Sequence, residues 1–332
     1  MSFEKKNAVK VVLICIVIAA FLAATLALIA VLERNYGIFP EQSGADKVIE
    51  YNGAEYVLND DIETFLILGL DKMSQDITGD SYNNNQQADF LMLMVFNHDK
   101  KTYTTLHINR DTMTEINVLG VAGNKTGTVN SQIALAHTYG KGGSVSNSNT
   151  ATAVSKLLHG IKVDHYMSVT LDAVPVMNDL VGGVTVEVLD DFSDTEIGLV
   201  KGETVKLSSE QALAYVQERS GVDNKTNVGR MERQKQYVEA MKDEVKKCIE
   251  NDSGFLTDMG VKMSDYMQSD CTTARLQEIG KRIQKYEFDG LREIEGESKL
   301  KENEDGSAFM EFYPDENALK ALVVELFYVP KK

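Results

Sequence analysis

The hydrophobic residues of this chain are gathered into dense runs that are separated by polar loops. The longest run, VVLICIVIAAFLAATLALIAVL, covers residues 11–32 without a single charge, and about 20 such residues are enough for a helix to cross a membrane. Lysines precede the run, and Glu33-Arg34 follows it in place of the small-residue cleavage site of a signal peptide. We therefore expect an uncleaved, single-pass anchor in the cell membrane. Residues 1–10 are expected in the cytoplasm and the main domain outside the cell. The alternatives are a cleaved signal peptide and a buried core helix.

Shorter apolar runs predict a sheet. TFLILGL (64–70), FLMLMVF (90–96) and YTTLHIN (103–109) are the first three expected strands, and the last two form a hairpin. Runs this apolar are typical of strands covered on both faces. Further strands are expected at 166–171 and 184–188, and helices at 131–139, 149–159, 172–180, 208–219 and 230–250. This order predicts an α/β fold, a three-layer α/β/α sandwich with a central mixed sheet, preceded by one N-terminal transmembrane helix.

The same pattern divides the chain into segments. Residues 33–63 are polar and are expected to form an extracellular stalk, and residues 64–250 to form the main domain. From 251 to 332 the periodicity weakens, and we expect an extension packed on the main domain. Its predicted elements are a helix at 274–286, a hairpin of 291–300 with 307–313, and a helix from Asp315 to Phe327.

Charge and cysteine content narrow the possible partners. The 332 residues include 50 acidic and 34 basic ones, a formal charge of −16, which repels the phosphates of nucleic acid and argues against such a partner. Cys15 lies in the expected anchor, whereas a disulfide between Cys248 and Cys271 is left open. The 5 histidines show no ligand-like spacing, so no structural zinc site is expected.

Two aspartates are candidates for binding a cation. Asp71 directly follows one expected strand, and Asp89 immediately precedes the next. If these strands are adjacent, both carboxylates reach the same edge of the sheet, where open α/β sheets place their ligands. Carboxylates together with substrate phosphates are suited to Mg²⁺. From the residues alone, ordinary strand-end turns are the commoner explanation.

Arginines offer the complementary chemistry. Arg110 follows a strand and adjoins Asp111, so it is either a structural ion pair or a guanidinium fork aimed at phosphate. Arg230 and Arg233 open a long predicted helix, where a concentration of positive charge in an acidic chain indicates an anion site. Surface arginines paired with Glu218 and Glu232 explain the same pattern.

Seven segments, taken in order, resemble the motifs of the LytR-CpsA-Psr (LCP) family of anchored cell-wall proteins. They are FLILGLD, ADFLMLMVFN, LHINRDT, VNSQIALAHTYG, VGGVTVEV, LSSEQALAYVQER and GRMERQKQ, from about residue 65 to 245. The resemblance implies a phosphotransferase that moves a glycan from a polyprenyl-pyrophosphate lipid to a hydroxyl group of peptidoglycan. By motif match Asp71 and Asp89 hold Mg²⁺, and the pyrophosphate is held by Arg110, Arg219, Arg230 and Gln234, with Arg233 in the same turn. Arg110, Asp111 and Arg219 are the expected catalytic residues, and the polyprenyl tail is expected near Leu93 and Val95.

The chain departs from the family pattern where charge is expected. Met73, Gln87, Thr128, Gln217 and Asn227 stand where the family pattern has a charged residue, and Asn109 stands where it has proline. Asn227 cannot serve as a base, which leaves Asp71 or Asp223. The lost charges support a rival hypothesis, a noncatalytic module that binds lipid pyrophosphate or glycan and regulates wall assembly. Pyrophosphate hydrolysis with water as the acceptor is a third possibility.

Overall fold

The structure is a computed structural model, and it describes residues 44–71, 84, 86–120, 122–193, 195–218, 227–252, 254–302 and 308–331. The expected anchor at 11–32 lies outside these residues. Within the described ranges, no helix is both long and apolar enough to cross a membrane.

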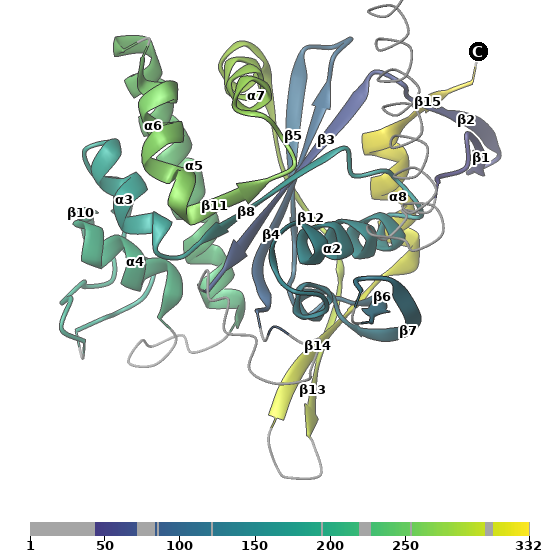
Figure 1. Cartoon of the computed structure of the whole chain (residues 1–332), viewed down its shortest axis with the longest axis horizontal. Coiled ribbons are helices and arrows are strands. Elements are labelled where there is room, and N and C mark those ends of the chain that lie inside the picture. Colours follow the sequence, from purple (N-terminus) through teal and green to yellow (C-terminus); the bar gives the residue numbers. More distant parts are fainter. Residues whose placement is uncertain are drawn as a thin grey trace, which may run out of the picture.

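A six-stranded mixed sheet forms the centre of the fold (Figure 1). Its strands stand in the order β11-β8-β3-β4-β5-β12. The β8–β3 and β5–β12 pairs are parallel and the others antiparallel. The bounds are β3 Ile62–Leu70, β4 Ala88–Asn97, β5 Thr102–Ile108, β8 His165–Thr170, β11 Met267–Ser269 and β12 Glu287–Glu293. The expected mixed sheet, its first three strands and their hairpin are confirmed.

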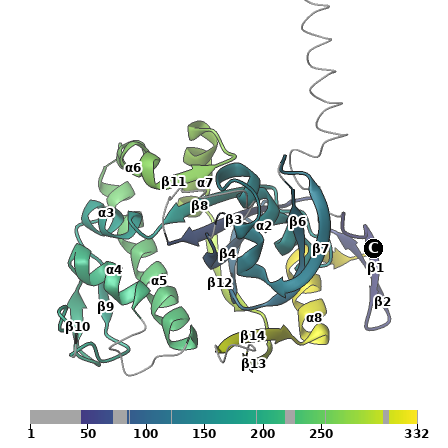
Figure 2. The ribbon, with the colours of Figure 1, turned by 60° about the horizontal axis from the view of Figure 1, so that its bottom comes forward.

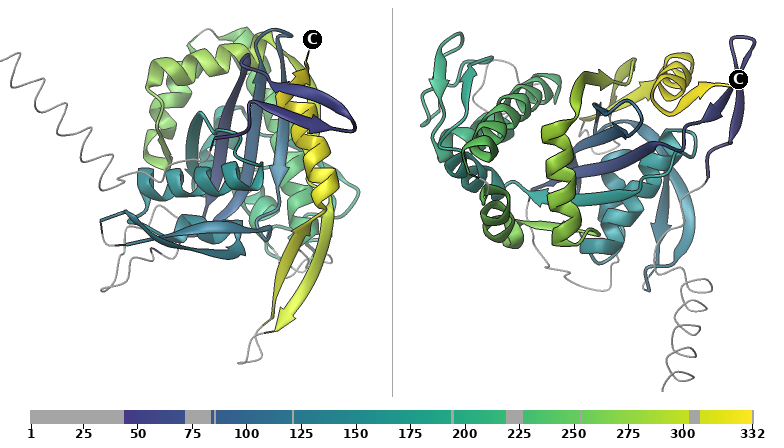
Figure 3. Two further views of the ribbon diagram at one scale, coloured as in Figure 1. Left: turned by 90° about the vertical axis from the view of Figure 1, so that its right-hand side faces the viewer. Right: turned by 90° about the horizontal axis from the view of Figure 1, so that it is seen from above.

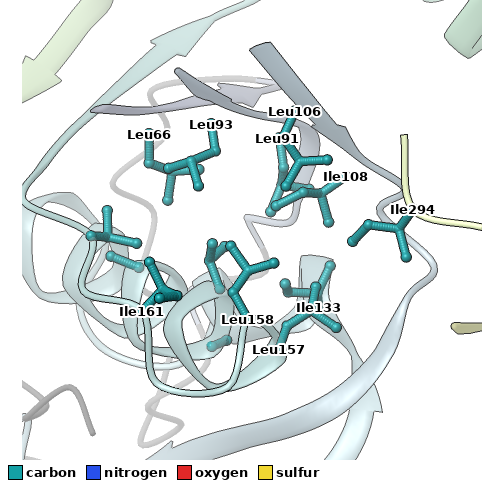
Figure 4. Packing of buried hydrophobic residues seen from close by; sticks show 14 of the residues in the cluster. Leu66, Leu91, Leu93, Leu106, Ile108, Ile133, Leu157, Leu158, Ile161 and Ile294 are labelled. Carbon is teal, nitrogen blue, oxygen red and sulfur yellow. The ribbon is translucent and has the colours of Figure 1, made fainter. Parts of the chain in front are cut away.

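Both faces of this sheet are covered, as the apolar runs predict. On β3, Leu66 and Leu68 face one core cluster, whereas Phe65 faces the other. Figure 4 shows the first cluster, in which leucines of the sheet meet Leu157 and Leu158. Each leucine buried in this way contributes about 1.5–3 kcal/mol to folding.

Helices form the outer layers. On the first face lie the 3-10 helix η1 Ile133–Thr138, α2 Gly143–Leu157 and the C-terminal α8 Glu316–Phe327; α7 Thr273–Lys285 covers the opposite face. The helix expected at 149–159 therefore begins six residues earlier. From Ser146 to Ser155 its polar side chains are buried, because side chains such as that of Asn149, which donates to Ala136 O at 2.8 Å, are hydrogen-bonded internally.

A second apolar cluster lies beside the sheet, on the side away from β1 and β2 (Figure 2). It is built by α3 Ala173–Leu180, β9 Thr185–Glu187, β10 Thr204–Lys206, α4 Ser209–Gln217, α5 Asn227–Asn251 and α6 Phe255–Met263, after which η2 Ser264–Tyr266 leads to β11. The capping chemistry expected at Ser208 is present, since its hydroxyl accepts from Gln211 N at 3.2 Å and the Gln211 side chain accepts in return. Asp172 holds the N-cap position of α3 but makes no side-chain cap bond.

Segments on both sides of the expected main domain, before residue 64 and after residue 250, contribute strands to the fold. β1 Val48–Tyr51 and β2 Ala54–Leu58 form a small sheet with the C-terminal β15 Tyr328–Pro330, so the end of the expected stalk is folded beside α8 (Figure 3). β12 lies within the central sheet, parallel to β5. The predicted hairpin is present as β13 Gly296–Glu302 and β14 Ala308–Pro314, and an unpredicted one pairs β6 Met113–Leu119 with β7 Lys125–Gln132.

Candidate functional site

The candidate site lies at one edge of the central sheet. β3 ends at Leu70, just before Asp71, and its antiparallel neighbour β4 begins beside that end. β5 runs antiparallel to β4 and ends at the same edge, followed by Arg110. The strand order therefore brings Asp71 and Asp89 together, as the strand-end argument predicted, and it places Arg110 beside them.

A β-bulge orients Asp89. Gly69 pairs with Phe90 and Leu70 with Ala88, so Asp89 is the extra residue on β4. A bulge bends its strand and re-aims a side chain, and the Asp89 carboxylate here accepts a hydrogen bond from Arg110 Nη1. A Cβ atom on Gly69 would lie 2.8 Å from Phe90 Cβ, so the bulge depends on glycine at this position.

Gly69→Ala is expected to destabilise the protein by about 1–3 kcal/mol, because the added methyl group has no room in a closely packed strand pair. Urea denaturation measures the change. Gly127→Ala is the matched control, since no other group lies within 4 Å of the place that its methyl group would take. Equal stability of the two variants would contradict the proposed steric role of Gly69.

The electrostatics of the edge show that four charged groups interact there. Partial burial raises the pKa of Asp71, and the charge of Asp89 together with a hydrogen bond to it raises this pKa further. The positive charges of Arg230 and Arg110 act in the opposite direction. Two neighbouring carboxylates and two guanidinium groups thus meet at one place, a suitable arrangement for a cation and an anionic substrate together.

Arg110 is held as a fork. Its Nη1 donates to Asp89 and its Nη2 to Gln87 Oε1. Its Nε lies 3.6 Å from Asp111 Oδ1 in an ion pair, and this carboxylate oxygen accepts a hydrogen bond from Gln132 Nε2 at 3.1 Å. Gln87 stands out in the sequence only as a lost charge, but in the structure it orients the arginine.

A match to a known protein family covers the candidate site and the sheet that carries it. A sequence profile of the LytR_cpsA_psr family matches residues 39–326, which is most of the chain and includes every strand of the central sheet. This chain belongs to the LytR_cpsA_psr family.

Named transferases are similar to part of the chain. TagU of Halalkalibacterium halodurans, a polyisoprenyl-teichoic acid–peptidoglycan teichoic acid transferase, is 30% identical over 178 residues, 54% of this chain and 51% of TagU. TagV of Bacillus subtilis, with the same enzyme name, is 34% identical over 164 residues, 47% of this chain and 38% of TagV. The matched part thus spans about half of these relatives or less. The structure of TagT bound to LIIa-WTA shares the fold at 22% identity, with a TM-score of 0.59 over 86% of this chain and 95% of TagT.

In this LytR_cpsA_psr protein, Arg233 does not join the carboxylate pair. Its side chain is fully buried, its Nε donates to Tyr215 O at 2.8 Å, and its other nitrogens contact Asp190 and Glu218 O. The guanidinium carbon also lies 5.3 Å from the Phe192 ring centroid. These contacts place Arg233 within the second apolar cluster, where it stabilises the fold. The sequence had instead led us to expect Arg233 to bind pyrophosphate. Nothing near Arg233 in the sequence shows these contacts, because Asp190 lies 43 residues earlier.

Of the other residues expected to bind pyrophosphate, one lies beside Asp71, one is buried against the backbone of α4, and one lies outside the described residues. Arg230 lies in the first turn of α5, is 5% exposed and interacts with Asp71. Gln234 is buried, and its Nε2 donates to Val216 O at 3.1 Å. Arg219 lies outside the described residues, as do Asp223 and Met73.

A buried polar network that sequence reasoning missed fixes the chain just before Asp89. Asn84 Nδ2 donates to His137 O at 3.0 Å and to Ser146 Oγ at 2.9 Å. His137 Nδ1 lies 2.9 Å from Gln86 O, and since a carbonyl oxygen only accepts, Nδ1 carries the proton. Burial lowers the pKa of His137, which favours the neutral ring. The network therefore positions Gln87, the residue that orients Arg110.

The burial of His107 is expected to make the protein less stable as the pH falls. This residue of β5 is 2% exposed and packs 5.2 Å from the Phe90 ring, and burial lowers its pKa from 6.5 to about 4. As the pH falls from 6.5 to about 4, the unfolded chain takes up a proton that the folded protein resists, so stability falls by about 3 kcal/mol.

Urea denaturation at several pH values in this range measures the free energy of unfolding. We expect this free energy to fall less steeply with decreasing pH in His107→Gln than in the unaltered protein. The exposed His159 provides the control as His159→Asn, which retains the original slope. An unchanged slope in His107→Gln would contradict the assignment to His107.

Proposed function

We propose that this protein transfers a glycopolymer phosphate from a polyprenyl-pyrophosphate lipid to a hydroxyl group of peptidoglycan. The observation that carries the proposal is the meeting of Asp71 and Asp89 with Arg110 and Arg230 at one edge of the sheet. The names of TagU and TagV support the reaction class and both substrates.

Mg²⁺ is the cofactor that this donor set fits. Burial and the adjacent charge of Asp89 raise the pKa of Asp71, and a divalent cation bound between the two carboxylates would offset that repulsion. When bound, the cation would neutralise charge on the pyrophosphate oxygens. Hard oxygen donors of this kind are those that Mg²⁺ prefers.

The arginines supply the remaining charge and the geometry. Phosphoryl transfer depends chiefly on positioning and on neutralising the oxygens around phosphorus. Arg110, fixed by Gln87 and Asp89, is suited to orient the pyrophosphate, with Arg230 beside it and Arg219 as a further ligand. Asp111 supports Arg110 from the other side.

In the proposed step, the acceptor hydroxyl forms an oxygen–phosphorus bond to the phosphate that carries the glycan. The bond between that phosphorus and the bridging oxygen breaks, and polyprenyl monophosphate leaves. The hydroxyl proton passes to a base, for which Asp71 is the candidate within the described residues. The alternative base, Asp223, lies outside them.

The proposed function also gives a role to the expected membrane anchor. A donor lipid is held in the bilayer, so an anchor at 11–32 would keep the domain close to it on the outer surface of the cell. The polyprenyl chain would approach the face of the sheet that carries Leu93 and Val95, which are buried opposite α2 (Figure 4 labels Leu93).

The rival function is a noncatalytic module that binds lipid pyrophosphate or glycan. Gln87 favours it, because a neutral amide stands where the family pattern has an arginine, and Gln217 removes a second charge. Hydrolysis of the pyrophosphate is the further alternative.

One assay separates these three functions. The full-length protein is incubated with Mg²⁺ and a polyprenyl-pyrophosphate-linked sugar, with and without a peptidoglycan oligomer, and polyprenyl monophosphate is measured. Transfer predicts release that requires the oligomer, hydrolysis predicts release without it, and a binding module predicts lipid binding with no release. An established transferase run in parallel verifies the substrates.

A further inference from the structure

A second cluster of potential ligands lies at the opposite edge of the central sheet from Asp71. β3 and β8 run parallel and begin at this edge, and β11 runs antiparallel to β8 and ends there. His165 is the first residue of β8, and Asp270 and Cys271 directly follow β11. One nitrogen, one carboxylate oxygen and the sulfur of these three side chains all lie within 4.8 Å of one another.

We propose that His165, Asp270 and Cys271 bind a divalent cation of the Zn²⁺ class, with water as the fourth ligand. A nitrogen, an oxygen and a sulfur donor together suit a borderline cation such as Zn²⁺. Mg²⁺, by contrast, prefers oxygen donors alone. The proposed site is therefore chemically distinct from the pair Asp71 and Asp89.

The surrounding hydrogen bonds hold the ligands in place. Asp270 Oδ1 accepts from Tyr166 N at 2.9 Å, and its Oδ2 lies 3.4 Å from His165 Nδ1. Cys271 N donates to Ser269 Oγ at 3.1 Å, and Ser269 in turn donates to Tyr166 O at 2.8 Å. One carboxylate oxygen is thus anchored by the backbone while the other faces the imidazole.

Glu63 provides the outer support for the histidine. His165 Nε2 lies 3.9 Å from Glu63 Oε1, so Nδ1 faces the cluster and Nε2 faces a carboxylate. A carboxylate behind a metal-binding histidine is a common arrangement that fixes the ring. Glu63 is itself held by Arg275 and Arg282 of α7. Glu278 pairs with both arginines as well, so two carboxylates offset the two positive charges near the site.

The proposed cation would join β8 to the turn between β11 and α7. His165 lies on β8, and Asp270 and Cys271 lie in the turn between β11 and α7. Thr272 follows at once as the N-cap of α7, where its hydroxyl accepts from Arg275 N at 3.3 Å. A bound cation would therefore fasten the start of the helix that covers the second face of the sheet, and it should raise the unfolding temperature.

Sequence spacing concealed this site. His165 and Asp270 lie 105 residues apart, and neither belongs to a short ligand motif. The expectation of no structural zinc site rested on such motifs, which report only ligands that are close in the chain.

Cobalt titration tests the proposal directly. The full-length protein, treated with a chelator and then freed of it, is titrated with Co²⁺, whose bond to a thiolate gives a charge-transfer absorption band. We expect one equivalent per chain, a band abolished by Zn²⁺, and a higher unfolding temperature with either cation.

Three variants assign the band. Cys271→Ser should abolish it, and Cys248→Ser, which changes the thiol on α5, should leave it intact. Asp270→Asn keeps an acceptor for Tyr166 N but loses the charge, and should weaken Co²⁺ binding at least about 10-fold. Absence of a band in the unaltered protein at saturating Co²⁺, or a band that persists in Cys271→Ser, would overturn the proposal.

Discussion

Replacing Arg110 by alanine is expected to lower the rate of glycan transfer about 1000-fold. The reason is geometric as well as electrostatic, because this guanidinium is fixed by Asp89 and Gln87 on one side and lies close to Asp111 on the other. Removing it takes a fixed positive charge from the phosphate that undergoes transfer. It also leaves the Asp89 carboxylate without its partner.

Arg110→Lys separates charge from geometry. Lysine keeps the positive charge but cannot contact Asp89 and Gln87 as a fork, so most of the loss should remain. Single-turnover rates measure the effect, and urea denaturation verifies that both variants fold. A rate for Arg110→Ala within a few-fold of the unaltered protein would exclude Arg110 from the chemistry.

Replacing Arg233 by methionine is expected to destabilise the protein by about 3–5 kcal/mol. The buried Asp190 would lose its ion-pair partner, and the carbonyl groups of Tyr215 and Glu218 would each lose a donor. A double variant, Arg233→Met with Asp190→Leu, should recover part of the loss, because it removes the unpaired charge as well.

Urea denaturation followed by circular dichroism measures the free energies of these variants. Lys247→Met is the control, since the ion pair of Lys247 with Glu244 is on the surface and its loss should leave the stability nearly unchanged. Unchanged stability of Arg233→Met together with weakened lipid binding would return Arg233 to the pyrophosphate site.

The strands near the site were predictable because their apolar runs are buried on both faces. β3, β4 and β5 follow the expected segments within a few residues, and their order alone places Asp71 near Asp89. The bulge at Asp89 was not predictable, because it depends on how Gly69 packs against Phe90 across the strand pair.

Buried polar side chains account for the main differences between the sequence-based expectations and the structure. The serine- and asparagine-rich start of α2 resembles a loop in sequence, and only its partners in η1 and the strands explain its burial. Arg233 resembled an anion ligand for the same reason, since Asp190 is distant in the chain. β12 was missed as a strand of the central sheet because its alternation is weak and its pairing with β5 is long-range.

Mass spectrometry of the product tests the central proposal most directly. A peptidoglycan oligomer is incubated with the full-length protein, Mg²⁺ and the polyprenyl-pyrophosphate-linked sugar, and the oligomer is then fragmented. We expect a phosphodiester between sugar and oligomer, one for each polyprenyl monophosphate released and absent with Arg110→Ala. A sugar phosphate free in solution, or bound lipid with an unmodified oligomer while an established transferase modifies it, would contradict transfer.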